Sequence, residues 1–379
     1  MKDKRNEILA KQLLEYSVEI KPGETLYLEI KGRDTLELGK CVIRTATRMG
    51  AVVFWYYSDD SLLRHWIMNA DDEQLKKQAD LHLNLMKRSD CYISLRGSDN
   101  PFDLADIEQG TIDRFNTLFY KPVHLEERVK RTRWVVLRFP NNAMAQLAET
   151  SQEAFEKFYY DVCCADYAKM SLAQDKLYAL VEATDKVQLK SPGTDLTFSI
   201  KGIPVMKCDG KRNIPDGEVY TAPVRDSVNG TITYNTPSLY QGTVYNNISL
   251  TFEKGKIVKA TCDGNDEILN KIFDTDEGAR YIGEFAIGVN PFILKPMKDT
   301  LFDEKIAGSF HLTPGQCYDE ASNGNDSSIH WDLVLIQRPD YGGGEMWFDG
   351  KLVRKDGVFT DASLEKDFSK ENLKAAGME

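Results

Sequence analysis

The sequence lacks the motifs and residue patterns that identify several common protein classes. It contains neither a GxGxxG nor a GxxxxGK[ST] motif, which argues against a nucleotide-binding function. Its seven cysteines are odd in number, scattered and without a CxxC pair, as is typical of reduced thiols in a cytoplasmic protein. No stretch approaches the roughly 18 apolar residues of a membrane span, and the N-terminus has no apolar signal-peptide core. We therefore expect a cytoplasmic protein that does not bind membranes.

The charge balance argues against nucleic acid as a partner. The chain has 48 basic and 59 acidic residues, which give a formal net charge of -11, and no cluster of Lys and Arg offsets this excess. Hydrophobic residues make up 42% of the sequence, as expected for a folded globular protein. At 379 residues the chain is too long for one ordinary core, so two or three domains are expected.

The first half of the chain alternates short apolar strands with helical stretches. The strands TLYLEI, AVVFWYY, CYISLRG and RWVVLRF predict a doubly wound α/β domain with a mostly parallel sheet. The run AVVFWYY shows no polar alternation, which predicts a strand buried on both faces. We expect this domain to span residues 1–183 and to end in a long joining helix over 151–182, capped by Thr150 with Glu153. A long helix of this kind is a common place for a dimer contact.

The second half has the sequence pattern of antiparallel β-structure. In KVQLK-SPGT-DLTFSI, apolar and polar residues alternate on both sides of a Pro-Gly turn, which predicts a β-hairpin. Further strand-like runs follow, and helical stretches are few, the main one being 265–274. We therefore predict a β-rich α+β domain over residues 184–379. The candidate metal ligands of the chain lie in this domain.

The stretch SSIHWDLVLI contains a pair of candidate metal ligands. It is expected to form a β-strand, in which His330 and Asp332 project from the same face because they are two residues apart. Two ligands held on one rigid strand can form half of a metal site. By itself the pair is also compatible with a structural His–Asp hydrogen bond.

Other residues of the same domain strengthen the metal interpretation. Glu218 and Glu284 each follow a glycine in apolar surroundings, and a carboxylate there is costly to bury unless it is paired or metal-bound. His311 and Tyr318 lie in HLTPGQCY, beside a Pro-Gly turn. Two His, one Asp and two Glu suit zinc, cobalt or manganese, and they suffice for two divalent metal ions that share a bridging carboxylate.

These strings, in this order, resemble the thermophilic-type metallo-aminopeptidase family, the group of aminopeptidase T and aminopeptidase S. The resemblance rests on NIPDGEVYTAP, GARYIGEFAIGVNP, HLTPGQCY and SIHWD, and it covers nearly the whole chain. It implies a homodimeric, two-metal exopeptidase that removes N-terminal residues from peptide substrates. By match to the family motifs, the implied active-site tyrosine is Tyr318, and the implied metal ligands are Glu218, Glu284, His311, His330 and Asp332.

For general base, Glu284 is preferred to Glu218 because its Gly-Glu-Phe-Ala setting is the more apolar, which raises a carboxyl pKa. Tyr318 is expected to donate a hydrogen bond to the oxyanion. Three alternatives remain open. His311, His330 and Asp332 alone could form the 2-His-1-carboxylate site of a mononuclear non-haem iron, ring-cleaving dioxygenase, although that site has no need of Glu218 and Glu284. The other two are another metal-dependent hydrolase on the same fold and a non-catalytic peptide-binding relative.

Overall fold

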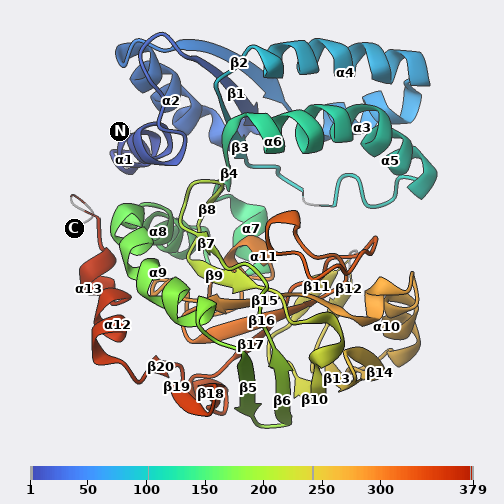
Figure 1. The fold of residues 1–379 in the computed structure, drawn as a ribbon. Coiled ribbons are helices and arrows are strands. Elements are labelled where there is room, and N and C mark those ends of the chain that lie inside the picture. The colour runs from blue at the N-terminus through green and yellow to red at the C-terminus, as the bar shows by residue number, and fades with distance from the viewer. Residues whose placement is uncertain (1–2, 101, 241–242, 376, 378–379) are drawn as a thin grey trace. The chain divides into compact units, whose positions relative to one another are not determined.

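The structure, a computed structural model, describes residues 3–100, 102–240, 243–375 and 377, and the chain divides into two compact units (Figure 1). Unit 1 comprises Met1–Ala165, Gly210–Pro215 and Gly377–Glu379, and unit 2 comprises Asp166–Asp209 and Asp216–Ala376. The sequence-based domain boundary lies between residues 183 and 184. The structure instead assigns the helix Tyr167–Glu182 to unit 2.

Unit 1 is an α/β unit built on a parallel sheet, as predicted. Its five strands are ordered β2-β1-β3-β4-β8, and every neighbouring pair is parallel. The strands are β1 (Thr25–Lys31), β2 (Val52–Ser58), β3 (Cys91–Arg96), β4 (Arg133–Arg138) and β8 (Asn213–Ile214). The helical segments are α1 (Arg5–Lys11), η1 (Gln12–Ser17), η2 (Arg33–Thr35), α2 (Leu36–Arg48), α3 (Asp60–Asn69), α4 (Asp72–Lys87), α5 (Gln109–Phe115), η3 (Asn116–Arg128), α6 (Val129–Arg131), α7 (Asn142–Leu147) and α8 (Gln152–Cys163).

One expectation about this sheet is wrong. The run AVVFWYY contains β2, but β2 is the edge strand and its side chains are largely exposed, with Val52 at 58% and Trp55 at 57%. The absence of polar alternation therefore does not reflect burial on both faces. It marks an apolar sheet edge that the rest of unit 1 leaves uncovered.

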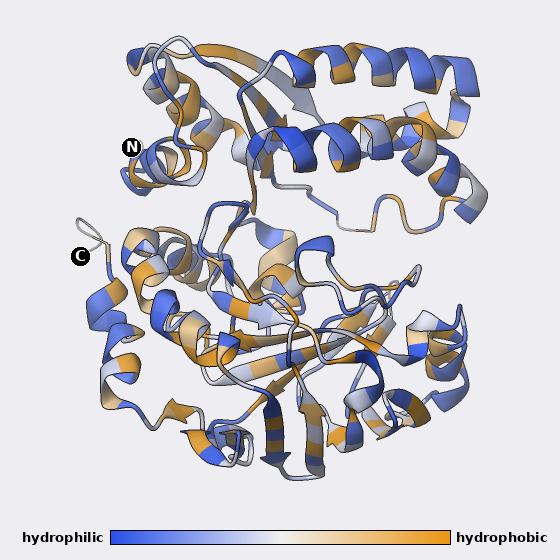
Figure 2. Cartoon of the chain, viewed as in Figure 1, coloured by the Kyte–Doolittle hydropathy of each residue, from blue (hydrophilic) through white to orange (hydrophobic). Residues whose placement is uncertain are grey.

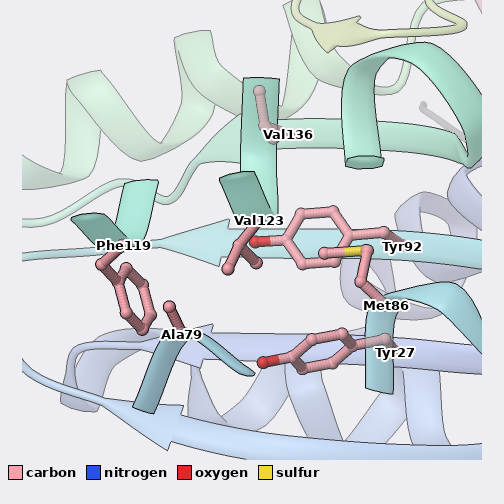
Figure 3. Packing of buried hydrophobic residues seen from close by; sticks show 7 residues of the cluster. All are labelled: Tyr27, Ala79, Met86, Tyr92, Phe119, Val123 and Val136. Carbon is pink, nitrogen blue, oxygen red and sulfur yellow. The ribbon is translucent and has the colours of Figure 1, made fainter. Parts of the chain in front are cut away.

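One hydrophobic cluster of unit 1 lies between the sheet and the helices α4 and η3 (Figure 3). Tyr27 of β1 and Tyr92 of β3 lie side by side in register, with ring centroids 5.4 Å apart. Both rings pack against Met86 of α4 and Val123 of η3. Each phenol still reaches a polar partner, because Tyr27 hydrogen-bonds His82 and Tyr92 donates to Glu29.

Unit 2 is β-rich and its two large sheets are antiparallel, as predicted. An eight-stranded sheet has the order β14-β13-β10-β6-β5-β18-β19-β20, and a five-stranded sheet has the order β17-β16-β15-β9-β7. The predicted hairpin is present as β5 (Lys186–Ser191) and β6 (Thr194–Ser199), and Figure 2 shows hydrophilic and hydrophobic residues alternating along it. The strands of the five-stranded sheet are β7 (Met206–Cys208), β9 (Glu218–Thr221), β15 (Ile282–Gly288), β16 (Ser309–Pro314) and β17 (Leu333–Ile336).

The remaining elements of unit 2 complete the eight-stranded sheet, add a small hairpin and supply short helices. The strands are β10 (Asn229–Thr233), β11 (Ser238–Tyr240), β12 (Thr243–Tyr245), β13 (Ser249–Glu253), β14 (Lys256–Thr261), β18 (Glu345–Phe348), β19 (Lys351–Lys355) and β20 (Val358–Phe359). The helical segments are α9 (Tyr167–Glu182), η4 (Arg225–Ser227), α10 (Asp266–Phe273), η5 (Gly278–Arg280), α11 (Thr300–Asp303), η6 (Asp319–Ala321), η7 (Pro339–Tyr341), α12 (Ala362–Asp367) and α13 (Lys370–Leu373).

The long helix predicted over 151–182 is two helices, α8 and α9. Residues 164–166 interrupt it, and the Asp166 side chain caps the new helix by accepting a hydrogen bond from the backbone N–H of Lys169. The cap of α8 also differs from the prediction, because Ser151, not Thr150, accepts the hydrogen bond from the Ala154 N–H. An aspartate directly before the first residue of a helix is an N-cap signal, which the apolar periodicity concealed.

Two further observations concern the chain as a whole. All seven cysteines are free thiols. Within the part of the chain that the structure describes, no helix combines the length and apolar character needed to cross a membrane.

Candidate metal centre

Three of the predicted ligands, each from a different strand, lie on one face of the five-stranded sheet of unit 2. Register pairs Ala286 of β15 with His311 of β16 on one side and with Tyr220 of β9 on the other. Because alternate residues of a strand share a face, Glu284 projects with His311, and Glu218 projects with Tyr220. All three ligand side chains are buried, with exposures of 4% or less.

A glycine precedes each glutamate because the backbone there is closely approached. A Cβ on Gly283 would lie 2.4 Å from the carbonyl oxygens of Gln316 and Gly315. Gly217 has a φ of 125°, and a Cβ there would lie 3.0 Å from Asn290 Cβ and from Met170 Sδ. The repeated Gly-Glu pattern thus marks two places where the strand that carries the carboxylate is packed tightly against a neighbouring segment.

His330 and Asp332 lie outside the strand in which they were expected. Strand β17 begins at Leu333, and His330 forms only an isolated bridge with Gly315. The two side chains nevertheless converge, with His330 Nε2 3.3 Å from Asp332 Oδ1. The Gln316 carbonyl oxygen, 2.7 Å from His330 Nδ1, fixes the ring so that Nε2 faces the carboxylates.

The five residues form one connected cluster. His330 Nε2 lies 3.4 Å from Glu284 Oε2, and His311 Nε2 lies 3.3 Å from Glu284 Oε1, so this carboxylate lies between the two imidazoles. His311 Nδ1 lies 3.9 Å from Glu218 Oε2. Asp332 Oδ1 accepts a 2.6 Å hydrogen bond from Thr313 Oγ1, which orients it toward the two rings.

The donor atoms of this cluster fit a bound cation. Glu284, His330 and Asp332 each offer a ligand atom, and these atoms lie within 4.8 Å of one another. Three buried polar atoms here have no hydrogen-bond partner: Glu218 Oε2, His311 Nδ1 and His330 Nε2. Buried polar groups without partners are rare unless an ion or water satisfies them. Mixed imidazole and carboxylate ligands suit zinc, cobalt or manganese.

The electrostatics of the cluster couple metal binding to protons. Burial lowers the pKa of His311 and His330, but the neighbouring carboxylates outweigh it and raise these values to about 9 and about 10. Burial raises the pKa of Glu284, whereas burial of Asp332 is outweighed by His330, which holds the Asp332 pKa below its ordinary value. An ion must therefore displace protons from the imidazoles, so its affinity increases with pH.

Tyr318 lies at the edge of the cluster. It directly precedes η6, and its ring centroid is 4.9 Å from that of His330 and 5.5 Å from that of Tyr220. The residue is 45% exposed. Partial burial of the side chain and the nearby Glu284 carboxylate raise its pKa, so the phenol keeps its proton and can donate it in a hydrogen bond.

Two charged residues at this centre were not predicted from the sequence. Lys305 is fully buried, and its Nζ lies 3.1 Å from Glu218 Oε1 and also contacts the Glu304 carboxylate. Glu304 lines, with Asp332, a cavity of about 20 Å³, which is room for about one water molecule. Both lie in the segment DEKIAG, whose charges are typical of a surface turn, and only the fold shows that Lys305 is buried and Glu304 half-buried.

Comparison with known proteins identifies related sequences. The profile of the family described as thermophilic metalloprotease (M29) matches residues 2–344. Aminopeptidase T of Thermus thermophilus is 27% identical over 94% of this chain and 97% of that protein. Aminopeptidase 2 of Geobacillus stearothermophilus is also 27% identical, over 92% of this chain and 94% of that protein.

Two solved structures share the fold across both units. The structure of wild-type AmpT from Thermus thermophilus has a TM-score of 0.75 at 22% identity and covers 94% of this chain and 99% of its own. The 2,5-dihydroxypyridine dioxygenase from Pseudomonas putida has a TM-score of 0.61 at 14% identity and covers 95% and 98%. At these identities the likeness concerns the fold alone.

Proposed function

Because the chain belongs to the thermophilic metalloprotease family (M29), we propose that it is a metal-dependent aminopeptidase that removes N-terminal residues from peptides. The relatives named aminopeptidase, aligned over most of the chain, support this activity. The observation that carries the proposal is the convergence of Glu218, Glu284 and His311 on one sheet face with His330 and Asp332.

The proposed centre holds two divalent ions, zinc, cobalt or manganese. Glu284, His330 and Asp332 are the proposed ligands on one side, and Glu218 and His311 on the other, with Glu284 between them. Bound divalent ions supply positive charge that lowers the pKa of water and polarises a carbonyl group. The unpartnered atoms on Glu218, His311 and His330 support this assignment of ligands.

The protein's own groups perform the proton transfers in this proposal. Glu284 is the proposed general base, and in the ion-free cluster burial raises its pKa. Tyr318 keeps its phenolic proton and donates a hydrogen bond to the oxygen that becomes negative as water adds to the scissile carbonyl.

The alternative of a mononuclear iron dioxygenase is not favoured. The fold is shared with a dioxygenase, but the family profile that matches is that of metalloproteases. Glu218, which a three-ligand iron site does not require, is buried and has one carboxylate oxygen without a partner. A single bound iron with oxygen uptake would favour the dioxygenase.

The decisive experiment measures hydrolysis of a panel of aminoacyl-nitroanilides by chelated protein and after addition of zinc, cobalt or manganese. We expect chelation to abolish hydrolysis and at least one ion to restore it, whereas an N-acetylated substrate stays intact. The matched controls are His330→Ala in the cluster and His82→Ala in unit 1, which should lose and retain activity, respectively. Failure of every ion to restore hydrolysis would refute the proposal.

We also propose a homodimer and a cytoplasmic location. The dimer is supported by the exposed apolar edge strand β2, because such an edge is a template for pairing with another chain. Sedimentation of wild type and Trp55→Glu tests this, with the variant expected to shift toward monomer. The free thiols support a reducing compartment.

A further inference from the structure

Lys305 is a buried cation in direct contact with a proposed metal ligand. The Lys305 side chain is 1% exposed, and its Nζ lies 3.1 Å from Glu218 Oε1. The same ammonium contacts the Glu304 carboxylate, so two anions hold it in place. A buried ammonium is tolerated only with such partners, because removal of its hydration shell is costly. Its position therefore depends on the carboxylates around it.

Glu218 also belongs to a second cluster of metal-competent side chains. Cys208, Asp216 and Glu218 each offer a ligand atom, and these atoms lie within 4.8 Å of one another. The cluster is built by strand pairing, since Cys208 of β7 is in register with Glu218 of β9, and Asp216 lies just before β9. A thiolate with two carboxylates is a donor set that zinc and cobalt accept.

The ammonium of Lys305 already contacts Glu218, one member of this second cluster. Burial acts to lower the pKa of Lys305, but the carboxylates of Glu218, Glu304 and Asp216 outweigh it and raise the value. A divalent ion placed among the same three side chains would face the ammonium at close range in a buried environment, where charges are weakly screened. The lysine and a metal ion are thus competing cations for the carboxylates of this cluster.

We propose that Lys305 is a resident cation that keeps metal ions out of the Cys208–Asp216–Glu218 cluster and holds Glu218 for the neighbouring centre. By binding Oε1, it leaves Oε2 as the Glu218 oxygen that faces His311, at 3.9 Å from Nδ1. Lys305 is therefore a positioning residue that acts through Glu218. This inference rests on the proposed function in treating Glu218 as a ligand of the metal centre.

The test counts bound ions and detects sulfur ligation. Wild type and Lys305→Met are dialysed against zinc for elemental analysis and against cobalt for near-ultraviolet absorption. We expect Lys305→Met to bind one more ion per chain than wild type and to gain a sulfur-to-cobalt charge-transfer band that wild type lacks. The double variant Lys305→Met/Cys208→Ser should lose both the additional ion and the band, and Lys305→Arg should behave as wild type.

Lys207 supplies a matched control. It neighbours Cys208 on β7 but its ammonium binds Asp175 and Ser171, so Lys207→Met removes one positive charge without freeing the cluster. The control should bind the same number of ions as wild type and show no band. An unchanged ion count and no band in Lys305→Met, with the variant shown to be folded by circular dichroism, would overturn the proposal.

A variant that fails to fold does not leave the proposal untested. In the wild-type background, Cys208→Ser should change neither the number of ions nor their affinity, because Cys208 is not a ligand there. A cobalt–thiolate band in wild type, or loss of an ion in Cys208→Ser, would contradict the role of Lys305. A wild type that binds no ion at all would instead refute the proposed function, and the difference between Lys305→Met and wild type would still decide the inference.

Discussion

The two units each carry a carboxylate on an inner strand of a five-stranded sheet, half-buried for Glu29 on β1 and buried for Glu284 on β15, and the fold stabilises the two charges differently. In unit 1, Glu29 accepts hydrogen bonds from Tyr92 at 2.5 Å, Ser94 at 2.8 Å and Ser58 at 3.2 Å. In unit 2, Glu284 faces the imidazoles of His311 and His330. Hydroxyl donors satisfy Glu29 from within the fold, whereas the neighbours of Glu284 are themselves potential metal ligands.

The protonation of the two carboxyls shows the same contrast. Burial acts to raise the pKa of Glu29, but His124, Arg96 and the hydroxyl donors outweigh it and lower the value to about 2. For Glu284 burial prevails, and its pKa is raised. A carboxylate whose charge the fold has already stabilised contributes to stability, and one whose charge remains costly is available for binding and catalysis. Four predictions test this distinction.

The largest expected effect is that of Glu284→Gln. The amide cannot take a proton from water and is a poorer ligand, so we expect kcat/KM to fall by roughly a thousandfold. Unfolding by heat should change little, since the amide preserves the shape of the side chain. The matched variant Glu29→Gln should keep the wild-type kcat/KM. Near wild-type hydrolysis by Glu284→Gln would rule out the proposed base.

A pair of tyrosines gives the second comparison. Tyr318→Phe removes the proposed oxyanion donor, and we expect kcat to fall about a hundredfold with an unchanged number of bound ions. Tyr92→Phe removes a donor to Glu29 and should lower stability while leaving kcat unchanged. Steady-state kinetics with elemental analysis measures both. Equal kcat values for Tyr318→Phe and wild type would leave Tyr318 as a packing residue beside His330.

The sequence was sufficient for the fold class and for the grouping of Glu218, Glu284, His311 and His330 with Asp332. Strand periodicity and the hairpin turn are local signals, and the ligand residues lie in short motifs with glycine or proline beside them. The exposure of β2 could not be predicted, because an apolar run does not reveal whether a neighbouring strand or helix covers it. Position within the sheet decides burial, and position depends on the whole topology.

The charged residues at the centre show a second limit. Lys305 and Glu304 lie in a segment that has the composition of a surface turn, yet the fold buries the lysine completely against Glu218. Pairing between residues so far apart in the chain leaves no local pattern. The same reason explains why His330 and Asp332 were expected inside a strand, whereas they lie just before β17 and converge through Gln316 and Thr313.

The third prediction concerns stability and metal. Since ions bind the folded state, zinc at a hundred times its dissociation constant should raise the free energy of unfolding by about 2.7 kcal/mol for each site. Chemical denaturation with and without zinc measures this gain. His330→Ala should lose the gain from at least one site, and His82→Ala should retain it. Equal stabilisation of the two variants by zinc would show that the ion binds elsewhere.

The smallest effect is the pH dependence of stability in the metal-free protein. Glu29 has a folded-state pKa of about 2, below its ordinary value of 4.5, so its contribution is fully present above about pH 4.5 and is lost as the pH falls toward 2. Glu29→Gln should remove this contribution, about 2 kcal/mol near neutral pH, and the difference from wild type should shrink on acidification.

Glu284 has the opposite sign, because its raised pKa means that the folded state holds the proton more tightly and loses stability as the pH rises. Relative to wild type, metal-free Glu284→Gln should therefore become more stable as the pH rises, whereas Glu29→Gln becomes less stable. Denaturation curves from pH 3 to pH 8 in chelator measure both differences, and a parallel pH response of the two variants would remove the distinction between a carboxylate used for folding and one kept for binding.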